Sequence, residues 1–463
     1  KAFQEAGNVL SLIDGNFEMT VLEKVYFNHL NIILVSFDKN LDSAKNWLEC
    51  NEALIETTEL KDNRYIIVRH HQQKARIYLQ FNDLKNVETS LNIIIEKLDD
   101  NIIQGNKSLL EIKSRALSEL ARITKHPTKP LIFMDQARLI DKKIYEEDPS
   151  NVANLIYFSV STGRLSKIFL QQKRLSDARE VLAETIPLLQ EKLLNITDNT
   201  MLLITGIVTT NKMVSIESQN DNYQAAIELV GLCESYLGKL TAVDEKNYFK
   251  IVIFTLQSKF YLAEKLEYVG CMKQTCERIN HLKNYFLDEK EKFQYVQLVY
   301  FRLRKKLAEI EGDTKIHGRI LSKQISLVEG QLAIDDTMDI THLSFLYSEK
   351  ADLLEKHSNY QNAVDYRLRL TQLEEKKFDP KLMGVNTAFG LSRIAWLFAK
   401  LNNNQQAHYF YLKALDIFNN PECTAQLGHF EFVNKKAMIL GYFSHFFESI
   451  KDIKQAYFYR RQE

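Results

Sequence analysis

The sequence predicts an all-α protein built as a linear array of antiparallel helical hairpins. Proline and glycine are scarce, at 6 and 15 of 463 residues, which favours long helices over a β-rich fold. Apolar residues recur at helical spacing, and small residues mark the places where two helices cross closely. Because these markers return about every 46 residues, the chain is expected to repeat one structural unit.

The clearest copy of this unit lies between Leu391 and Phe418. Its first helix carries apolar residues on one face at spacings of three, one and three, and a polar turn follows at 401–404. Ala395 in the first helix precedes Ala407 in the second by twelve residues. Two small side chains allow the helices to cross closely, so the segment is predicted to form a tight hairpin.

This hairpin resembles a tetratricopeptide repeat, with small and aromatic residues in the family order and Pro421 near its end. The resemblance implies a right-handed superhelical solenoid whose first helices line a concave face. The small-residue markers from Ala44 to Ala456 span 412 residues in nine steps, or about 46 each, whereas the usual repeat of the family has about 34. The helices of this chain are therefore expected to be longer.

Ten hairpins are expected between residue 28 and the end of the chain. His126-Pro127 and Pro130 should lengthen the turn of the third, Pro187 should kink the second helix of the fourth, and the seventh is faint. The helical period is lost at 330–340, which predicts a soft point. The array then divides into an N-terminal part, residues 1–330, and a C-terminal part, residues 331–463, without interruption between them.

Composition excludes several function classes. The chain has 60 basic and 60 acidic residues, which argues against direct nucleic-acid binding. Five scattered cysteines form no disulfide framework. No membrane span or signal peptide is visible, so a cytoplasmic location is expected, or a periplasmic one if a signal or span lies outside this segment. The sequence starts without Met and ends in a helical pattern, which indicates a fragment of a longer protein.

Motifs for enzymatic chemistry are absent from the sequence. It contains no Gly-rich phosphate loop, no Walker-type lysine motif, no HExxH and no CxxC. His70 and His71 are adjacent on a helix and should point to different faces. His429 and Glu431 could form an acid–base pair, but two such residues before a helix often occur by chance. The sequence therefore predicts no enzyme, no cofactor and no metal site.

The predicted concave face presents mainly basic and amide side chains, with aromatic residues toward the C-terminal end. Arginine, lysine and amide groups suit the carboxylates and backbone amides of an extended acidic peptide. Trp396 is the strongest single candidate for an anchor, since an aromatic side chain in a groove often dominates binding. The groove candidates are Arg69, Gln73, Arg76, Arg164, Lys167, Lys212, Arg393, Trp396 and Lys400.

Two functions follow from this pattern. The first is a non-enzymatic scaffold that binds a protein or peptide in its concave face. The second is a sensory or regulatory input region of a larger bacterial signalling protein, a cyclase, kinase or transcription regulator with its output domain outside this segment. The Lys and Asn pattern of the carboxylate clamp found in some family members is not reproduced, which argues against recognition of a C-terminal acidic tail of that kind.

Overall fold

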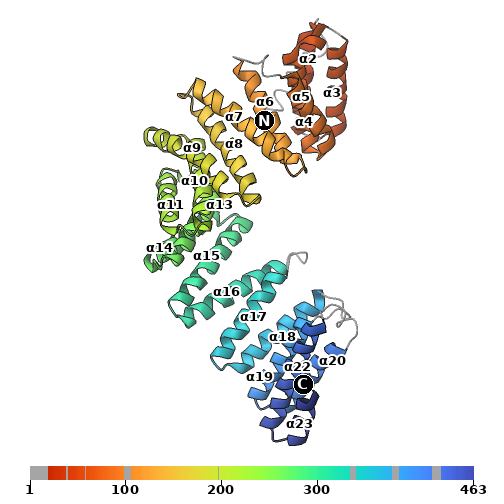
Figure 1. Ribbon diagram of the computed structural model, residues 1–463, viewed down its shortest axis with the longest axis vertical. Coiled ribbons are helices and arrows are strands. Elements are labelled where there is room, and N and C mark those ends of the chain that lie inside the picture. The colour runs from red at the N-terminus through yellow and green to blue at the C-terminus, as the bar shows by residue number, and fades with distance from the viewer. Residues whose placement is uncertain are drawn as a thin grey trace. The chain divides into compact units, whose positions relative to one another are not determined.

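The computed structural model describes residues 19–37, 40–57, 59–98, 106–196, 198–333, 340–377, 385–419 and 429–462. Throughout these stretches the regular elements are helices, and no strand occurs in them (Figure 1). The fold is an all-α array of tetratricopeptide-like helical hairpins, as the sequence predicts. The chain divides into two compact units, residues 1–267 and 268–463.

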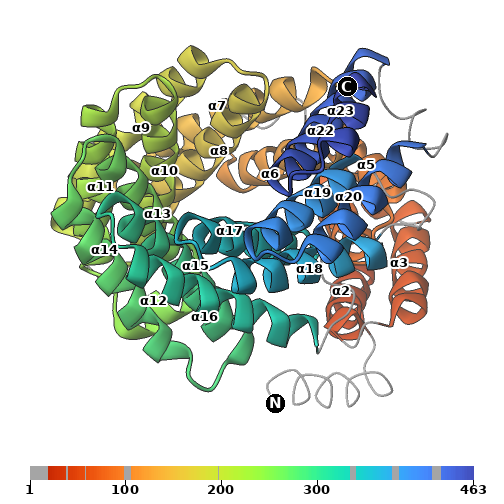
Figure 2. The same cartoon turned by 90° about the horizontal axis from the view of Figure 1, so that it is seen from below.

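The first unit is built from five packed hairpins followed by further helices. In each hairpin the second helix returns antiparallel along the first, and the hairpins follow one another in sequence order (Figures 1 and 2). The hairpins pair α2 (Val21–Phe37) with α3 (Leu41–Glu56), α4 (Arg64–Gln80) with α5 (Leu84–Lys97), α6 (Lys107–Ile123) with α7 (Lys129–Glu147), α8 (Val152–Gln171) with α9 (Leu175–Asn195), and α10 (Thr200–Gln219) with α11 (Tyr223–Leu237). The shorter elements and the last helix are η1 (Glu59–Asp62), α12 (Ala242–Asn247) and α13 (Phe249–Lys265).

The second unit opens with α14 (Val269–Leu282) and η2 (Lys283–Phe286). Its hairpins pair α15 (Lys290–Ile310) with α16 (Thr314–Leu332), α17 (Thr341–Lys356) with α18 (Tyr360–Lys377), α19 (Val385–Lys400) with α20 (Asn404–Asn419), and α22 (His429–Ser449) with α23 (Ile453–Gln462). Nine of the ten predicted hairpins are thus present in the described stretches. The helices predicted for the sixth, α13 and α14, belong to different units.

One type of turn recurs between the two helices of most hairpins. Asn82 has a positive φ of 58°, the Asp83 amide donates to the Tyr78 carbonyl oxygen at 2.9 Å, and the Asn82 amide donates to the Leu79 oxygen at 3.1 Å. This is the Schellman arrangement, which caps the last carbonyls of a helix with one left-handed residue. Positive-φ residues also follow α13 and the first helices of the later hairpins, at intervals of 44 to 49 residues: Lys173, Asp221, Glu267, Gly312, Ser358, Asn402 and Lys451.

The third hairpin lacks this turn, as its prolines predict. The chain leaves α6 in extended conformation at Thr124, and α7 carries Pro130 in its first turn. A proline tolerates that position because the first amides of a helix have no partner in the helix anyway. In the fourth hairpin Pro187 lies inside α9, where the sequence places it.

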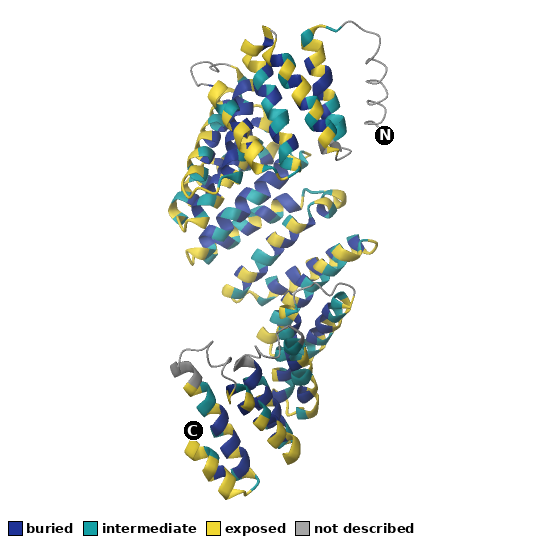
Figure 3. Ribbon diagram, turned by 90° about the vertical axis from the view of Figure 1, so that its right-hand side faces the viewer, coloured by how far each residue is buried: buried dark blue, intermediate teal, exposed yellow. Residues whose placement is uncertain are grey.

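The small-residue markers lie at the helix crossings. Ala44, Ala137, Ala226 and Ala407 are fully buried, and each unit buries its apolar side chains where neighbouring helices meet (Figure 3). Cys271 of α14 differs from these markers because it is only half-buried. Met272 and Cys276 on the same helix are buried.

The soft point predicted at 330–340 stays a prediction. Helix α16 continues to Leu332, and residues 334–339 lie outside the described part of the chain. Among the described residues, no helix combines the length and the apolar character needed to cross a membrane.

Candidate functional site

A cavity of about 640 Å³ lies in the first unit, where α4, α6 and α8 run past one another. These are the first helices of three consecutive hairpins, so the cavity lies on the face that the sequence predicts to be concave. Its apolar base includes Leu91 and Ile94 from α5 and Ala116 from α6. Four of the predicted groove residues line it together: Arg69, Gln73, Arg76 and Arg164.

The arginines of this cavity differ in how they are held. Arg69 donates from Nε to the Tyr65 hydroxyl and from a guanidinium nitrogen to Gln72 Oε1, both at 3.2 Å. Arg115, which the sequence analysis did not select, lies over the Tyr157 ring at 5.3 Å and 3.7 Å from Glu111. Arg76 and Arg164 are exposed, and neither has an ion-pair partner among the described residues. These two guanidinium groups are therefore available to a ligand.

The cavity also carries carboxylates that the sequence analysis did not place there. Glu111 and Glu119 come from α6, and Asp141 comes from α7. Asp141 is 8% exposed and accepts a hydrogen bond from the Ser114 hydroxyl at 2.5 Å. Burial raises the pKa of Asp141, which the nearby serine hydroxyls and arginines oppose. The groove is thus a mixed-charge surface that includes the exposed guanidinium groups of Arg76 and Arg164.

Amide and apolar groups complete the lining. The buried Oε1 of Gln73 has no hydrogen-bond partner within the described chain. Tyr157 and Val160 of α8 are 44% and 38% exposed, and Met201 of α10 is 54% exposed. An extended peptide can satisfy the Gln73 acceptor with one backbone N–H. Its apolar side chains can then contact Tyr157, Val160 and Met201.

Lys167 and Lys212 lie next to this cavity without lining it. Lys212 reaches from α10 to α8, where its Nζ donates to the carbonyl oxygen of Gly163 at 2.7 Å. Burial, with Lys167 and Arg164 nearby, lowers the pKa of Lys212 to about 8. The prediction that Lys212 belongs to the same face is consistent with this contact, although part of its role is to bridge two helices.

The remaining candidates lie in the second unit, around a cavity of about 460 Å³ that includes Arg393, Trp396 and Tyr442. Arg393 donates from Nε to Glu355 at 2.8 Å, and Glu355 is only 8% exposed. The Trp396 ring is covered by the Arg393 guanidinium at 4.3 Å and by the Lys400 ammonium at 5.4 Å. Because the chain's own cations occupy the ring, Trp396 is less available as an anchor than the sequence suggests.

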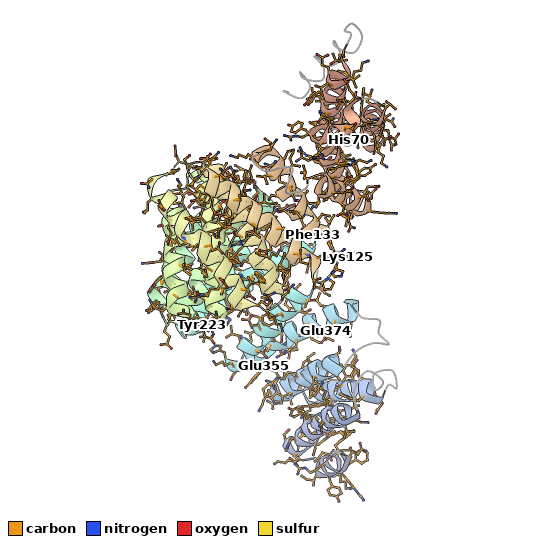
Figure 4. The ribbon with its side chains drawn as sticks, turned by 45° about the horizontal axis from the view of Figure 1, so that its top comes forward. His70, Lys125, Phe133, Tyr223, Glu355 and Glu374 are labelled. Atoms are coloured by element: carbon orange, nitrogen blue, oxygen red, sulfur yellow. The ribbon has the colours of Figure 1, made fainter. Side chains whose placement is uncertain are left out.

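Arg367 strengthens the same cluster. It is bonded to Asp352 and also contacts Glu355 at 3.1 Å. Glu355 therefore pairs with two arginines at once. Figure 4 labels it together with Glu374, whose pKa is raised by burial. The predicted groove residues thus form two separate groups, one in each unit. In the second unit Arg393 is paired with Glu355 and Lys400 lies over the Trp396 ring, whereas Arg76 and Arg164 in the first unit have no ion pair among the described residues.

A buried histidine cluster is the main feature that sequence reasoning missed. His70, labelled in Figure 4, is 2% exposed and stacks on His29 of α2 at 6.1 Å and against His71 at 5.4 Å. Burial lowers the pKa of His70 to about 3 and those of His29 and His71 to about 4. His29 is 41 residues away in sequence, and no local motif links it to His70.

Other reactive groups are held in non-reactive settings. Glu309, His317 and Glu349 have ligand atoms within 4.8 Å of one another, but Lys305 Nζ already binds Glu349 at 2.6 Å. Burial raises the pKa of the Cys276 thiol to about 12, which keeps it protonated. The side chains of the suggested acid–base pair, His429 and Glu431, lie outside the described residues.

Comparisons with known proteins concern the fold. No protein-family model matches the chain. No curated protein matches it either. Among solved structures, the apo form of RapI is 13% identical, with 66% of this chain and 97% of that chain covered and a TM-score of 0.37. A tetratricopeptide repeat protein from Parabacteroides merdae is 14% identical, covering 71% and 98%, with a TM-score of 0.32. Aspartyl phosphate phosphatase F from Bacillus subtilis is 12% identical, covering 88% and 96%, with a TM-score of 0.36.

Proposed function

We propose that this chain is a non-enzymatic scaffold that binds an extended protein segment in the cavity between α4, α6 and α8. The observation that supports it is the pair of exposed arginines, Arg76 and Arg164, which line one cavity and form no salt bridge among the described residues. A cation without a partner on a helix face is ordinary, but two that converge on a cavity of this size form a recognition surface.

The chemistry of the lining defines the ligand. Guanidinium groups bind carboxylates through paired hydrogen bonds. The unpartnered acceptor of Gln73 accepts from a backbone N–H, and Tyr157 and Val160 offer apolar contacts to a side chain. The ligand is therefore a peptide that carries an acidic residue near an apolar one. The carboxylates Glu111 and Glu119 also line the cavity, so they would repel a uniformly acidic peptide.

Peptides selected from a random library displayed on phage test this proposal. Selected peptides should bind the double variant Arg76→Glu plus Arg164→Glu at least about tenfold more weakly, which is about 1.4 kcal/mol. The matched control, Lys85→Glu plus Lys143→Glu, makes the same change of charge on exposed positions of the second helices α5 and α7 and should bind as the wild type does. Equal affinity for both double variants would refute the groove as the binding surface.

The alternative, an input region of a larger signalling protein, stays a prediction. It requires the same binding step and differs in what binding triggers. The peptide titration addresses the shared step only.

A further inference from the structure

Three cations converge on one turn of α8. In an α-helix the carbonyl oxygen of a residue points toward the amide four residues later, so the Gly163 oxygen points toward Lys167. Lys212 Nζ donates to that oxygen at 2.7 Å, which places the ammonium against the turn that carries Arg164 and Lys167. Arg164 and Lys167 are three residues apart and therefore neighbours on one helix face. A Cβ at position 163 would lie 2.5 Å from Lys212 Nζ, so the close approach depends on the glycine.

No carboxylate neutralises this group. Arg164, Lys167 and Lys212 have no ion pair with an acid within the described chain, and only cations contribute charge effects to Lys212. The charge of Asp141 interacts with Arg164. Asp141 is buried and already accepts from Ser114, so it leaves most of the positive charge unbalanced. Three like charges held close together cost free energy unless an anion joins them.

We propose that Arg164, Lys167 and Lys212 form a subsite for the phosphoryl group of a phosphorylated peptide side chain. A phosphoryl group carries nearly two negative charges at neutral pH and three acceptor oxygens. Three donors from three side chains match those oxygens, and a dianion balances the cluster better than a single carboxylate does. Lys212 has three donor hydrogens, and one is enough for its bond to Gly163.

The subsite extends the proposed groove and rests on the proposed function. Arg164 belongs to both, because it lines the cavity and stands beside Lys167. A peptide lying along α8 would place its apolar residue against Tyr157 and Val160 and its phosphorylated residue about two helical turns further along the helix, at Lys167. The proposal therefore specifies the spacing of the two groups in the ligand.

Acetylation of individual lysines, followed by mass spectrometry, tests the subsite without a known partner. Inorganic phosphate, an N-acetyl-phosphoserine amide and an N-acetyl-aspartate amide serve as probes. A bound dianion favours the charged ammonium, so the phosphate probes should slow acetylation of Lys212 at least about threefold. Lys350 is the matched control, since its Nζ donates to the Gly318 carbonyl oxygen at 2.9 Å in the same manner. Its acetylation should not change.

Variants locate the effect. Lys167→Gln should abolish the protection, Lys167→Arg should retain it, and Lys143→Gln, an exposed lysine on α7, should have no effect. Peptides selected for the groove and then phosphorylated at this spacing on either side of their apolar residue should gain at least about tenfold in affinity at one of the two positions, and Lys167→Gln should remove that gain.

Three outcomes would overturn the proposal. Unchanged Lys212 labelling with both phosphate probes refutes the subsite, and unphosphorylated peptides that still require Arg76 leave the proposed function intact. Equal protection by the aspartate amide assigns the subsite to carboxylates. Protection by inorganic phosphate without any gain for phosphopeptides refutes the peptide source. Protection by both phosphate probes together with a failed groove titration supports the subsite and refutes the proposed function.

Discussion

Acid should destabilise the first unit through its buried histidines. His29 and His70 are 8% and 2% exposed, and burial lowers their pKa values to about 4 and about 3. The groups around them are Arg69 and Lys74, which lower these pKa values further, and Glu52 and Lys97, which act on the neighbouring His71. These residues come from α2, α3, α4 and α5, so the cluster joins the first two hairpins.

The sign and size of the effect follow from linkage. The unfolded chain takes up protons near pH 6.5, while the folded chain holds both imidazoles neutral until about pH 4, so stability is complete above pH 6.5 and falls as the pH drops toward 4. Between pH 7 and pH 5 each histidine costs about 2 kcal/mol, and the two together cost about 4 kcal/mol. This is a large fraction of the stability of an ordinary domain.

Urea unfolding at several pH values, with hydrogen exchange of α2 and α4 as a local readout, measures this loss. The double variant His29→Leu plus His70→Leu should lose about 4 kcal/mol less between pH 7 and pH 5 than the wild type does. Its stability at pH 7 should change little, because His29 Nε2 and both His70 nitrogens are buried without partners in the described structure. His126→Gln, which alters an exposed histidine of the same unit, is the control. The same acid sensitivity in the double variant and the wild type would refute the reasoning.

Two further predictions concern the repeat itself. Ala407→Glu should lower the free energy of unfolding by about 3–5 kcal/mol, because it places a charge at a fully buried helix crossing. Gln405→Glu, at an exposed position, should leave it unchanged. Thermal unfolding measures both variants, and a fully stable Ala407→Glu variant would contradict the hairpin packing. Lys173→Gly should stabilise by about 1 kcal/mol in urea unfolding, because Lys173 has a φ of 60° that glycine adopts without strain; an unchanged or lower midpoint would count against the shared turn geometry.

The repeat could be predicted from the sequence because each hairpin depends on residues that are close together along the chain. Helical period and the small residues at crossings, such as Ala395 and Ala407, identify each hairpin within one stretch of chain. From Lys173 onward the positive-φ turn recurs at 44 to 49 residues, in agreement with the predicted spacing of about 46. It was not recognised because lysine, glutamate and serine occupy it at several positions where glycine would have signalled a left-handed residue.

The residues of the candidate site could be predicted from the sequence only in part. The helical period places Arg76 and Arg164 on the predicted concave face. The two residues line one cavity although they are 88 residues apart in sequence. The same period also selects Arg393 and Trp396, and their partner Glu355 became visible only in three dimensions. A face can be assigned from periodicity, but whether a cation is free depends on the neighbouring helix.

The sequence by itself determined the fold class and nine of the hairpins, because each depends on residues close together along the chain. Tertiary structure decided which charges are paired, where Asp141 is buried, and which histidine joins His70. It also decided that Lys212 reaches across to Gly163. These features depend on contacts between residues 27 to 49 positions apart, which the packing of one helix on another brings together and no periodicity encodes.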